Sequence, residues 1–192
     1  MKKVLLMNMP SSIRIYKGTK SALKGIIAPR PLVSLVELAG SVLYAGGDCK
    51  ILDLQASEKP FDELEKTLSS FKPDIVGLTF TTLLFEEAKQ VAKFIKEKAP
   101  KTLIIAGGVH PTIYPEEVAK VSDIDIVVYG EGDITLQEIV KGIRLKQVKG
   151  IIYKEKGKTI RNPPQPLIEN LDSLPYPAWF LLNSSIYINP KG

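Results

Sequence analysis

Up to Gly150, the chain alternates short apolar runs with longer segments in which apolar residues recur at helical spacing. The short runs suit strands that are buried on both faces, as in a parallel sheet. Five such strands are predicted, at residues 3–8, 49–54, 75–80, 103–106 and 125–129. Between the third and the fourth, apolar residues recur at i, i+3 and i+4, which predicts a helix with one buried face. These residues are Leu84, Ala88, Val91, Ala92 and Ile95.

Further helices are predicted between the strands, and residues that favour helix ends bound some of them. Pro31 can open the first helix, because its missing N–H is not needed there, and Gly46 with Gly47 closes it. Pro100 ends the helix before the fourth strand. The remaining helices are expected at residues 61–71, 115–121 and 135–143.

This alternation predicts an α/β fold with a doubly wound, five-stranded parallel sheet of the flavodoxin-like (Rossmann-like) kind. The expected strand order is 2-1-3-4-5, with right-handed crossovers. The carboxyl ends of strands one, three, four and five then share one rim of the sheet. Ligands of open α/β sheets bind outside the carboxyl ends of the strands, so this rim is where a site is expected.

The pattern changes after Gly150. Residues 151–153 and 158–161, separated by a turn, predict a β-hairpin, and prolines recur beyond Asn162, which excludes a long helix or a central strand. We therefore divide the chain into an α/β domain at residues 1–147 and a hairpin with a linker at residues 148–192. Trp179, Phe180 and residues 181–182 form an apolar cluster in the linker. Burying one such side chain contributes ~1.5–3 kcal/mol, so the cluster must pack on the domain, on another domain or on a second copy.

Composition narrows the possible functions. The chain is 44% hydrophobic and 24% charged, which is ordinary for a globular protein, and no apolar run approaches the ~20 residues of a membrane helix. The apolar run at residues 4–7 is too short for a signal peptide, so a cytoplasmic location is expected. The single cysteine, Cys49, excludes an internal disulfide and a cysteine-held cluster within this chain. A net charge of +5, spread along the chain, favours a solvated surface over a nucleic-acid site.

Several common motifs are absent. No Gly-x-Gly-x-x-Gly follows the first strand, and no Gly-x-x-x-x-Gly-Lys-Ser/Thr occurs, which excludes the dinucleotide fingerprint and the P-loop. No Gly-x-Ser-x-Gly marks a serine nucleophile. The first and third strands end in Asn8 and Thr79, where a phosphoacceptor signalling domain would carry acidic residues.

Glycines and threonines at the strand ends are candidate ligand contacts, and each has a purely structural alternative. Gly107 and Gly108 let the backbone approach a large ligand closely, or they only form a tight turn. We expect a side chain at Gly108 to block a ligand and to leave the fold largely intact. The hydroxyls of Thr79, Thr81 and Thr82 could bind a ligand, or one of them, Thr82 above all, could cap the following helix.

Two further rim positions carry titratable side chains. His110 could meet a ligand or a metal, although a lone histidine at a strand end is more often satisfied by backbone hydrogen bonds. Glu131, between Gly130 and Gly132, could reach a ligand hydroxyl. The equally weighted alternative is that this loop leads into a helix with Asp133 as its N-cap.

Taken together, these segments resemble the N-terminal cobalamin-binding domain of radical S-adenosylmethionine (SAM) enzymes, the group that includes the anaerobic magnesium-protoporphyrin monomethyl ester cyclase. The resemblance covers nearly the whole chain, and the order and spacing of its motifs are together fairly specific. It rests on residues 3–10, 31–32 with the helix that follows, 74–82, 107–111 with 115–117, 129–133, the hairpin, and 171–177.

In that family the nucleotide tail of cobalamin typically slots between the sheet and its helices, past a Ser-x-Leu motif after strand three and a Gly-Gly after strand four. Residues 79–81 stand in place of the first motif, and Gly107 with Gly108 matches the second. The Asp-x-His-x-x-Gly motif that supplies a histidine to cobalt is absent after Asn8, so the resemblance implies base-off cobalamin with no histidine ligand, and His110 is not expected to coordinate cobalt. The cofactor-binding residues implied are Met9, Pro10, Thr79, Thr81, Thr82, Gly107, Gly108, Val109, His110, Gly130, Glu131 and Gly132.

The resemblance also implies a larger enzyme. The Cys-x-x-x-Cys-x-x-Cys motif that would hold a [4Fe-4S] cluster is absent, so the cluster and SAM are expected in a C-terminal radical SAM domain of a longer parent chain, of which this chain is a truncated part. The domain would bind and orient the corrinoid for methyl transfer or oxidative cyclisation on an unactivated carbon of a small-molecule substrate, and none of its residues is expected to be catalytic.

Two other functions remain open. The first is a degenerate module that keeps the fold, lacks cobalamin and serves in docking or substrate recognition. The second, an FMN-binding flavodoxin-like protein, is weaker, because the loop after Asn8 lacks a compact phosphate cradle.

Overall fold

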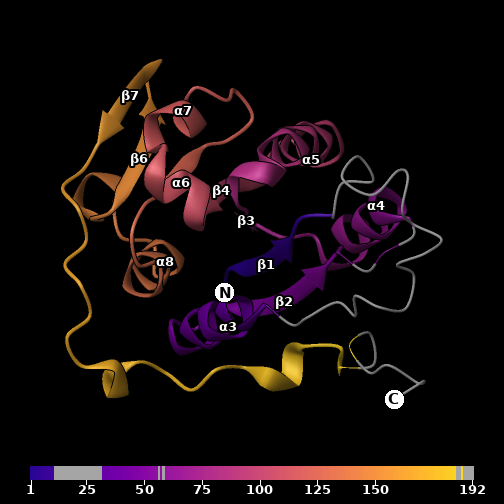
Figure 1. Ribbon diagram of the computed structural model, residues 1–192, viewed down its shortest axis with the longest axis horizontal. Helices are drawn as coiled ribbons and strands as arrows, with labels where there is room; N and C mark the ends of the chain where they lie inside the picture. Colours follow the sequence, from indigo (N-terminus) through magenta and orange to yellow (C-terminus); the bar gives the residue numbers. More distant parts are fainter. Residues whose placement is uncertain (11–31, 56, 58, 185–186, 188–192) are drawn as a thin grey trace.

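The computed structural model describes residues 1–10, 32–55, 57, 59–184 and 187, and within them a seven-stranded sheet runs in the order β2-β1-β3-β4-β5-β6-β7 (Figure 1). The strands are β1 (Lys3–Asn8), β2 (Asp48–Asp53), β3 (Ile75–Thr79), β4 (Leu103–Gly107), β5 (Ile126–Val128), β6 (Ile151–Glu155) and β7 (Lys158–Arg161). The helices are α3 (Val33–Tyr44), α4 (Pro60–Phe71), α5 (Phe85–Lys98), α6 (Val109–Ile113), α7 (Pro115–Ala119) and α8 (Asp133–Val140). Strands β1 to β5 pair in parallel, which confirms the fold class and the order 2-1-3-4-5.

The predicted hairpin is present, but it extends the sheet instead of standing apart from it. β6 pairs antiparallel with β5, so that Ile151 lies opposite Val128, and β7 pairs antiparallel with β6. The sheet therefore has seven strands and is mixed, where five parallel strands were expected. Pairing with β6 covers the backbone groups that β5 would otherwise leave exposed at the edge of the sheet. The division of the chain at residue 147 stays a prediction.

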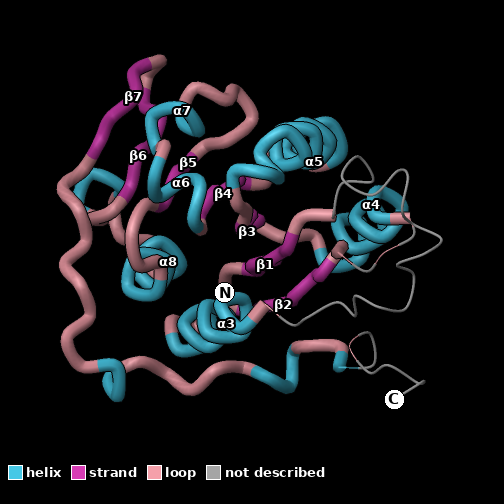
Figure 2. Tube along the Cα trace, in the orientation of Figure 1, coloured by secondary structure: helices cyan, strands magenta, loops and turns pink. Residues whose placement is uncertain are grey.

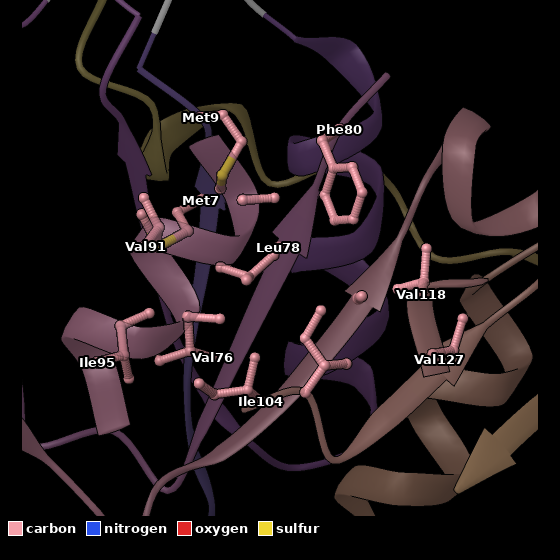
Figure 3. Close-up of a cluster of buried hydrophobic side chains, with 14 of the residues drawn as sticks. Met7, Met9, Val76, Leu78, Phe80, Val91, Ile95, Ile104, Val118 and Val127 are labelled. Atoms are coloured by element: carbon pink, nitrogen blue, oxygen red, sulfur yellow. The ribbon is translucent and has the colours of Figure 1, made fainter. Parts of the chain in front are cut away.

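Helices cover both faces of the sheet (Figure 2). Because side chains alternate along a strand, Leu5 and Met7 of β1 point to one face, and Val4 and Leu6 point to the other. α4, α5 and α7 pack on the first face, and α3 and α8 pack on the second. Full burial of each large apolar side chain contributes ~1.5–3 kcal/mol, so these two layers hold the strands in place. Figure 3 shows the first layer, with Val91 and Ile95 of α5 beside the strand residues.

The helices differ from the prediction at several points, and α7 ends at Ala119, two residues before the predicted end. α3 begins at Val33, while Pro31 lies outside the described residues. α6 was not predicted, because a five-residue helix directly after Gly108 is too short to show a helical period. α8 runs from Asp133 to Val140, not over 135–143, since Gly142 at φ 78° turns the backbone left-handed just beyond the helix end. No helix within the described ranges is long and apolar enough to cross a membrane.

Residues 162–182, here called the strap, return across the domain from β7 toward the β2 edge. Figure 1 shows the strap passing α8 and then running along α3. The backbone N–H of Ala178 donates to the carbonyl of Val36 in α3 (2.8 Å), and the Ala178 side chain is buried. The backbone of Tyr176 lies so close to Gly40 of α3 that a Cβ there would collide with the Tyr176 carbonyl oxygen. A glycine in the middle of the helix therefore makes room for the strap.

The apolar cluster of the linker is only partly packed. Leu181 contacts the α3-side core, so this part of the cluster packs on the domain, which is one of the three possibilities expected. Trp179 and Phe180, however, keep 50% and 79% of their surface exposed, and Tyr176 keeps 95%. The strap is thus held by its backbone and by small or aliphatic side chains, and it presents its aromatic side chains outward.

Replacing Gly40 by alanine tests this packing. Alanine favours a helix interior by roughly 0.5–1 kcal/mol, but overpacking against the backbone of Tyr176 costs about 1–3 kcal/mol. We therefore expect Gly40→Ala to lower the free energy of unfolding by about 1 kcal/mol in a urea titration. Ser34→Ala, at an exposed position of the same helix, serves as the control. A variant more stable than the parent would show that the strap does not press on Gly40.

Candidate functional site

The register of the sheet brings the expected strand ends together. Asn8 at the end of β1 lies opposite Thr79 at the end of β3, and Thr79 lies opposite Gly107 at the end of β4. The turns that follow are joined by hydrogen bonds from the backbone N–H of Phe80 to the Gly107 carbonyl (3.3 Å) and from the N–H of His110 to the Phe80 carbonyl (3.2 Å). The predicted rim is therefore a continuous structure.

Gly107, the last residue of β4, and Gly108, which follows it, differ in whether the described fold requires a glycine. Gly108 has φ 98°, and a Cβ on it would lie 2.6 Å from Thr79 Oγ1 and 3.2 Å from Phe80 N. The fold itself requires glycine at this position, so the expectation that a side chain here would spare the fold is wrong. Gly107 lies outside the left-handed region, and the nearest described atom to its ideal Cβ is Val128 Cβ at 4.0 Å. Among the described residues, a Cβ at Gly107 would make only an ordinary van der Waals contact, so nothing in this part of the fold requires glycine there.

His110 is closed off from solvent, with 2% of its surface exposed. Its Nδ1 lies 3.2 Å from Thr82 Oγ1, while Nε2 is buried and has no hydrogen-bond partner in the described part of the chain. The rings of Phe85, Tyr114 and Phe80 surround it at centroid distances of 4.4, 5.3 and 5.9 Å. We expected backbone hydrogen bonds to satisfy this side chain, but its only hydrogen-bond partner among the described residues is the hydroxyl of Thr82. A buried polar atom without a partner costs about 1–3 kcal/mol.

The threonines after β3 do not cap the next helix. Thr81 precedes the 3-10 turn at Thr82–Leu84, and no side-chain capping bond forms there. The hydroxyl of Thr82 contacts His110 instead, so the capping interpretation of Thr82 is wrong. Thr81 and Thr82 are exposed and Thr79 is half-buried, so all three can be reached from the rim.

The carboxylates of the loop after β5 are already engaged by other parts of the domain. Glu131 accepts a hydrogen bond through Oε2 from the backbone N–H of Ile168 in the strap (2.8 Å). Asp133 is the first residue of α8, not its N-cap, and its Oδ1 accepts from Ser41 Oγ of α3 (3.0 Å). Gly132 is the N-cap of α8, and Gly130 has φ 82°, a conformation that favours glycine.

At the end of β1, Met9 is fully buried in the α5-side core, where Figure 3 shows it beside Met7. Its side chain therefore packs inside the domain and does not face the rim. Pro10 is half-buried, and residues 11–31 of the expected loop lie outside the described residues.

Sequence reasoning missed two features of the rim. Thr112 joins two turns, because its hydroxyl donates to the Gly108 carbonyl (2.8 Å) and accepts from the Gly130 N–H (3.2 Å). Leu83 and Ile113 were also missed, whereas Val109 was predicted; these three apolar side chains of the rim are exposed by 75% (Leu83), 58% (Ile113) and 58% (Val109), and together they are called the apolar patch. The i, i+4 spacing of Val109 and Ile113 is the only sequence signal for Ile113, and it spans a single helical turn.

The described residues offer no other reactive centre. No group of three or more His, Cys, Asp or Glu side chains within them could hold a metal ion. Burial raises the pKa of the Cys49 thiol to about 12, so this cysteine stays protonated and is a poor nucleophile. What the rim offers is a site for binding: bare backbone at Gly107, hydroxyls from the threonines and an apolar patch.

Comparison with known proteins gives a family match over most of the chain. The family model described as "B12 binding domain" matches residues 23–140. An uncharacterized methyltransferase of Pyrococcus horikoshii is 37% identical over 187 residues, which cover 94% of this chain and 40% of that protein. The anaerobic magnesium-protoporphyrin IX monomethyl ester cyclase of Rubrivivax gelatinosus is 32% identical over 162 residues, covering 79% of this chain and 29% of that protein. The chain thus spans less than half the length of these relatives.

Solved structures show the same fold. The cobalamin-dependent S-adenosylmethionine radical enzyme OxsB, with aqua-cobalamin and S-adenosylmethionine bound, superposes with a TM-score of 0.70 at 22% identity, covering 93% of this chain and 24% of that one. The radical S-adenosylmethionine methyltransferase TsrM from Kitasatospora setae, with tryptophan substrate and a SAM analog bound, also gives 0.70, at 19% identity over 86% of this chain and 31% of that one.

The two glycines predict opposite effects on stability. Gly108→Ala places a side chain in the left-handed region and against Thr79, which together should cost about 2–4 kcal/mol. Gly107→Ala would only bring a Cβ into ordinary contact with Val128 Cβ (4.0 Å), and it restricts the unfolded chain, so it should leave the free energy of unfolding unchanged or raise it by up to about 1 kcal/mol. Urea titrations of the two variants side by side test this. Equal losses would mean that the fold needs both glycines.

Proposed function

The chain belongs to the family of B12-binding domains, and on that basis we propose that it binds and orients the corrinoid of a cobalamin-dependent radical SAM enzyme. The observation that carries the proposal is Gly107. A glycine without a side chain costs conformational entropy, roughly 0.5–1 kcal/mol relative to alanine within a regular element. The described fold gains nothing from it, because a Cβ at Gly107 would have space. A ligand that lies against this backbone accounts for it.

The residues around Gly107 fit a large ligand with an apolar body and polar side groups. Leu83, Val109 and Ile113 would supply apolar contact, and the hydroxyls of Thr79 and Thr81 would hydrogen-bond its amides or its nucleotide tail. The methyl-transfer or radical chemistry would come from the bound cobalamin, while the protein contributes binding and orientation.

We propose that the cobalamin is held without a histidine ligand to cobalt. His110 is the only histidine of the chain, and its ring is enclosed by Phe85, Tyr114 and Phe80. Its Nδ1 is already paired with Thr82, and Nε2 has no accessible surface. Presenting either nitrogen to a metal would require this aromatic enclosure to open.

The larger enzyme is part of the proposal. The only cysteine, Cys49, is buried, so the cysteines that would hold a [4Fe-4S] cluster, and the site for SAM, would lie in a radical SAM domain outside this chain. The relatives named above support methyl transfer or oxidative cyclisation on a small-molecule substrate as the reaction of the whole enzyme. Residues 1–147 would form the corrinoid domain, and residues 148–192 would lead toward the radical SAM domain.

A docking module without cobalamin is the second candidate. The observation that favours it is the row of outward-facing aromatic side chains on the strap, Tyr176, Trp179 and Phe180. Such side chains suit a protein partner whether or not a cofactor is bound. Direct measurement of corrinoid binding decides between the two candidates.

Gly107→Val tests the main proposal. If the ligand lies against this backbone, an added isopropyl group should weaken binding of hydroxocobalamin at least about tenfold, equivalent to about 1.4 kcal/mol, in a titration followed by visible absorbance. Ser122→Val places the same side chain at an exposed position before β5, at the opposite end of the sheet, and should bind like the parent chain. The unfolding curve of each variant shows whether the fold is intact. Unchanged affinity in a folded Gly107→Val would place the ligand elsewhere, and no binding by the parent chain would favour the docking module.

The histidine-free cobalt site gives a spectroscopic prediction. The cobalamin-loaded chain should show a base-off absorption spectrum, and His110→Ala should leave that spectrum unchanged, because neither ring nitrogen reaches the metal. Free imidazole, added to the loaded parent chain, shows what nitrogen ligation would look like. A spectrum that shifts on removal of His110 would establish it as a cobalt ligand.

A further inference from the structure

The strap begins beside the rim, and two residues at the carboxyl end of β5 hold it there. The hydroxyl of Tyr129 donates to the carbonyl of Asn162, the first residue of the strap. Glu131 accepts a hydrogen bond through Oε2 from the backbone N–H of Ile168 (2.8 Å). Only Gly130 separates Tyr129 from Glu131, so the rim loop itself carries both contacts.

Between residues 162 and 168, the strap is rich in proline and cannot hold its conformation by hydrogen bonds of its own. Pro163, Pro164 and Pro166 have no N–H to donate, and an extended proline-rich segment forms no internal hydrogen bonds. Hydrogen bonds from the domain must therefore hold it. Beyond Ile168, the next backbone hydrogen bond to the domain within the described residues is that of Ala178 to Val36 (2.8 Å). Glu131 thus holds the rim end of a span of about ten residues.

We propose that Glu131 is a positioning residue that ties the strap to the ligand-facing rim, and that it is not a contact for the ligand. Its carboxylate is engaged by the strap, whereas the bare backbone and the threonine hydroxyls face the rim. Because Glu131 lies within the rim loop, a displacement of this loop must move the strap or break the bond to Ile168. The bond also fixes the start of the span that leads to Ala178, where the separate hydrogen bond to Val36 holds the segment that carries Trp179 and Phe180.

Hydrogen exchange on the free chain tests the proposal without a cofactor. In Glu131→Ala, exchange of the Ile168 amide should rise roughly tenfold, which corresponds to about 1.4 kcal/mol. Glu131→Gln keeps an oxygen that can accept the N–H, so it should restore most of the protection. Glu169→Ala removes an exposed carboxylate next to Ile168 and should exchange like the parent chain. The rescue by glutamine separates an acceptor role from a general loss of packing.

The fluorescence of Trp179, the single tryptophan, reports on the second attachment of the strap, the hydrogen bond between Ala178 and Val36. Trp179 follows Ala178, so its quenching by acrylamide should stay at the parent level in Glu131→Ala, which would show that the release is local. Ile168→Pro removes the donor from the strap side and leaves Glu131 in place, and it should raise exchange of the Gly150 amide, whose N–H donates to the strap carbonyl of Pro163 (2.8 Å). This variant keeps the test decisive if Glu131→Ala fails to fold.

Two results would overturn the proposal. One is an Ile168 amide that exchanges equally fast in the parent chain and in Glu131→Ala. The other is a Glu131→Gln chain whose Ile168 stays protected but which binds hydroxocobalamin tenfold more weakly than the parent, since that would make Glu131 a ligand contact. The exchange experiment needs no cobalamin, so its outcome stays readable even if the chain fails to bind the corrinoid and the proposed function falls.

Discussion

Burial of the central strands on both faces is the constraint on which the other features depend. β1 and β3 lie between two helical layers, and the side chains of Val4, Leu5, Ile75 and Val76 are almost completely buried. A one-residue slip of either strand would exchange its two faces and break both layers at once. The register is therefore fixed, and it sets the strand ends level at the rim. The position of the candidate site is a consequence of how the core packs.

At that rim, one Gly-Gly pair serves two purposes. Gly108 makes the turn, because its left-handed backbone lets the chain pass within contact distance of Thr79 and Phe80. The same turn directs His110 back toward β3, where its N–H meets the Phe80 carbonyl and its ring meets Thr82. Gly107 is then left as bare backbone on which, among the described residues, a Cβ would meet only Val128 Cβ at 4.0 Å. The two glycines are adjacent in the motif, but the structure gives them different roles.

The sequence was sufficient for the sheet and insufficient for the side chains around it. Apolar periodicity, which reports burial directly, indicated the strands, and their alternation with helices indicated the order of the five parallel ones, but neither showed that the hairpin extends the sheet as β6 and β7. Glu131 and Asp133 could not be placed in this way, because their partners, Ile168 and Ser41, lie 37 and 92 residues away. The same holds for Gly40, which is a plain helix residue until the strap is seen to pass it. Contacts between distant segments leave no local period in the sequence.

Two features of the rim, the glycine at position 107 and the Nε2 of His110, which is unpaired among the described residues, lower the stability of the domain. A chain selected only for stability would place alanine at Gly107, which has room for a side chain, and would give His110 Nε2 a partner or replace the ring by a phenyl group. Each omission costs roughly 0.5–3 kcal/mol, a noticeable part of a domain's net stability of about 5–15 kcal/mol. Local choices that disagree with the fold are expected where function requires them. Both occur in the turn after β4, next to the threonines of β3, and neither is repaired by any contact within the described residues. Within the described residues, these two costs therefore lie at the edge of the sheet where the fold would bind a ligand.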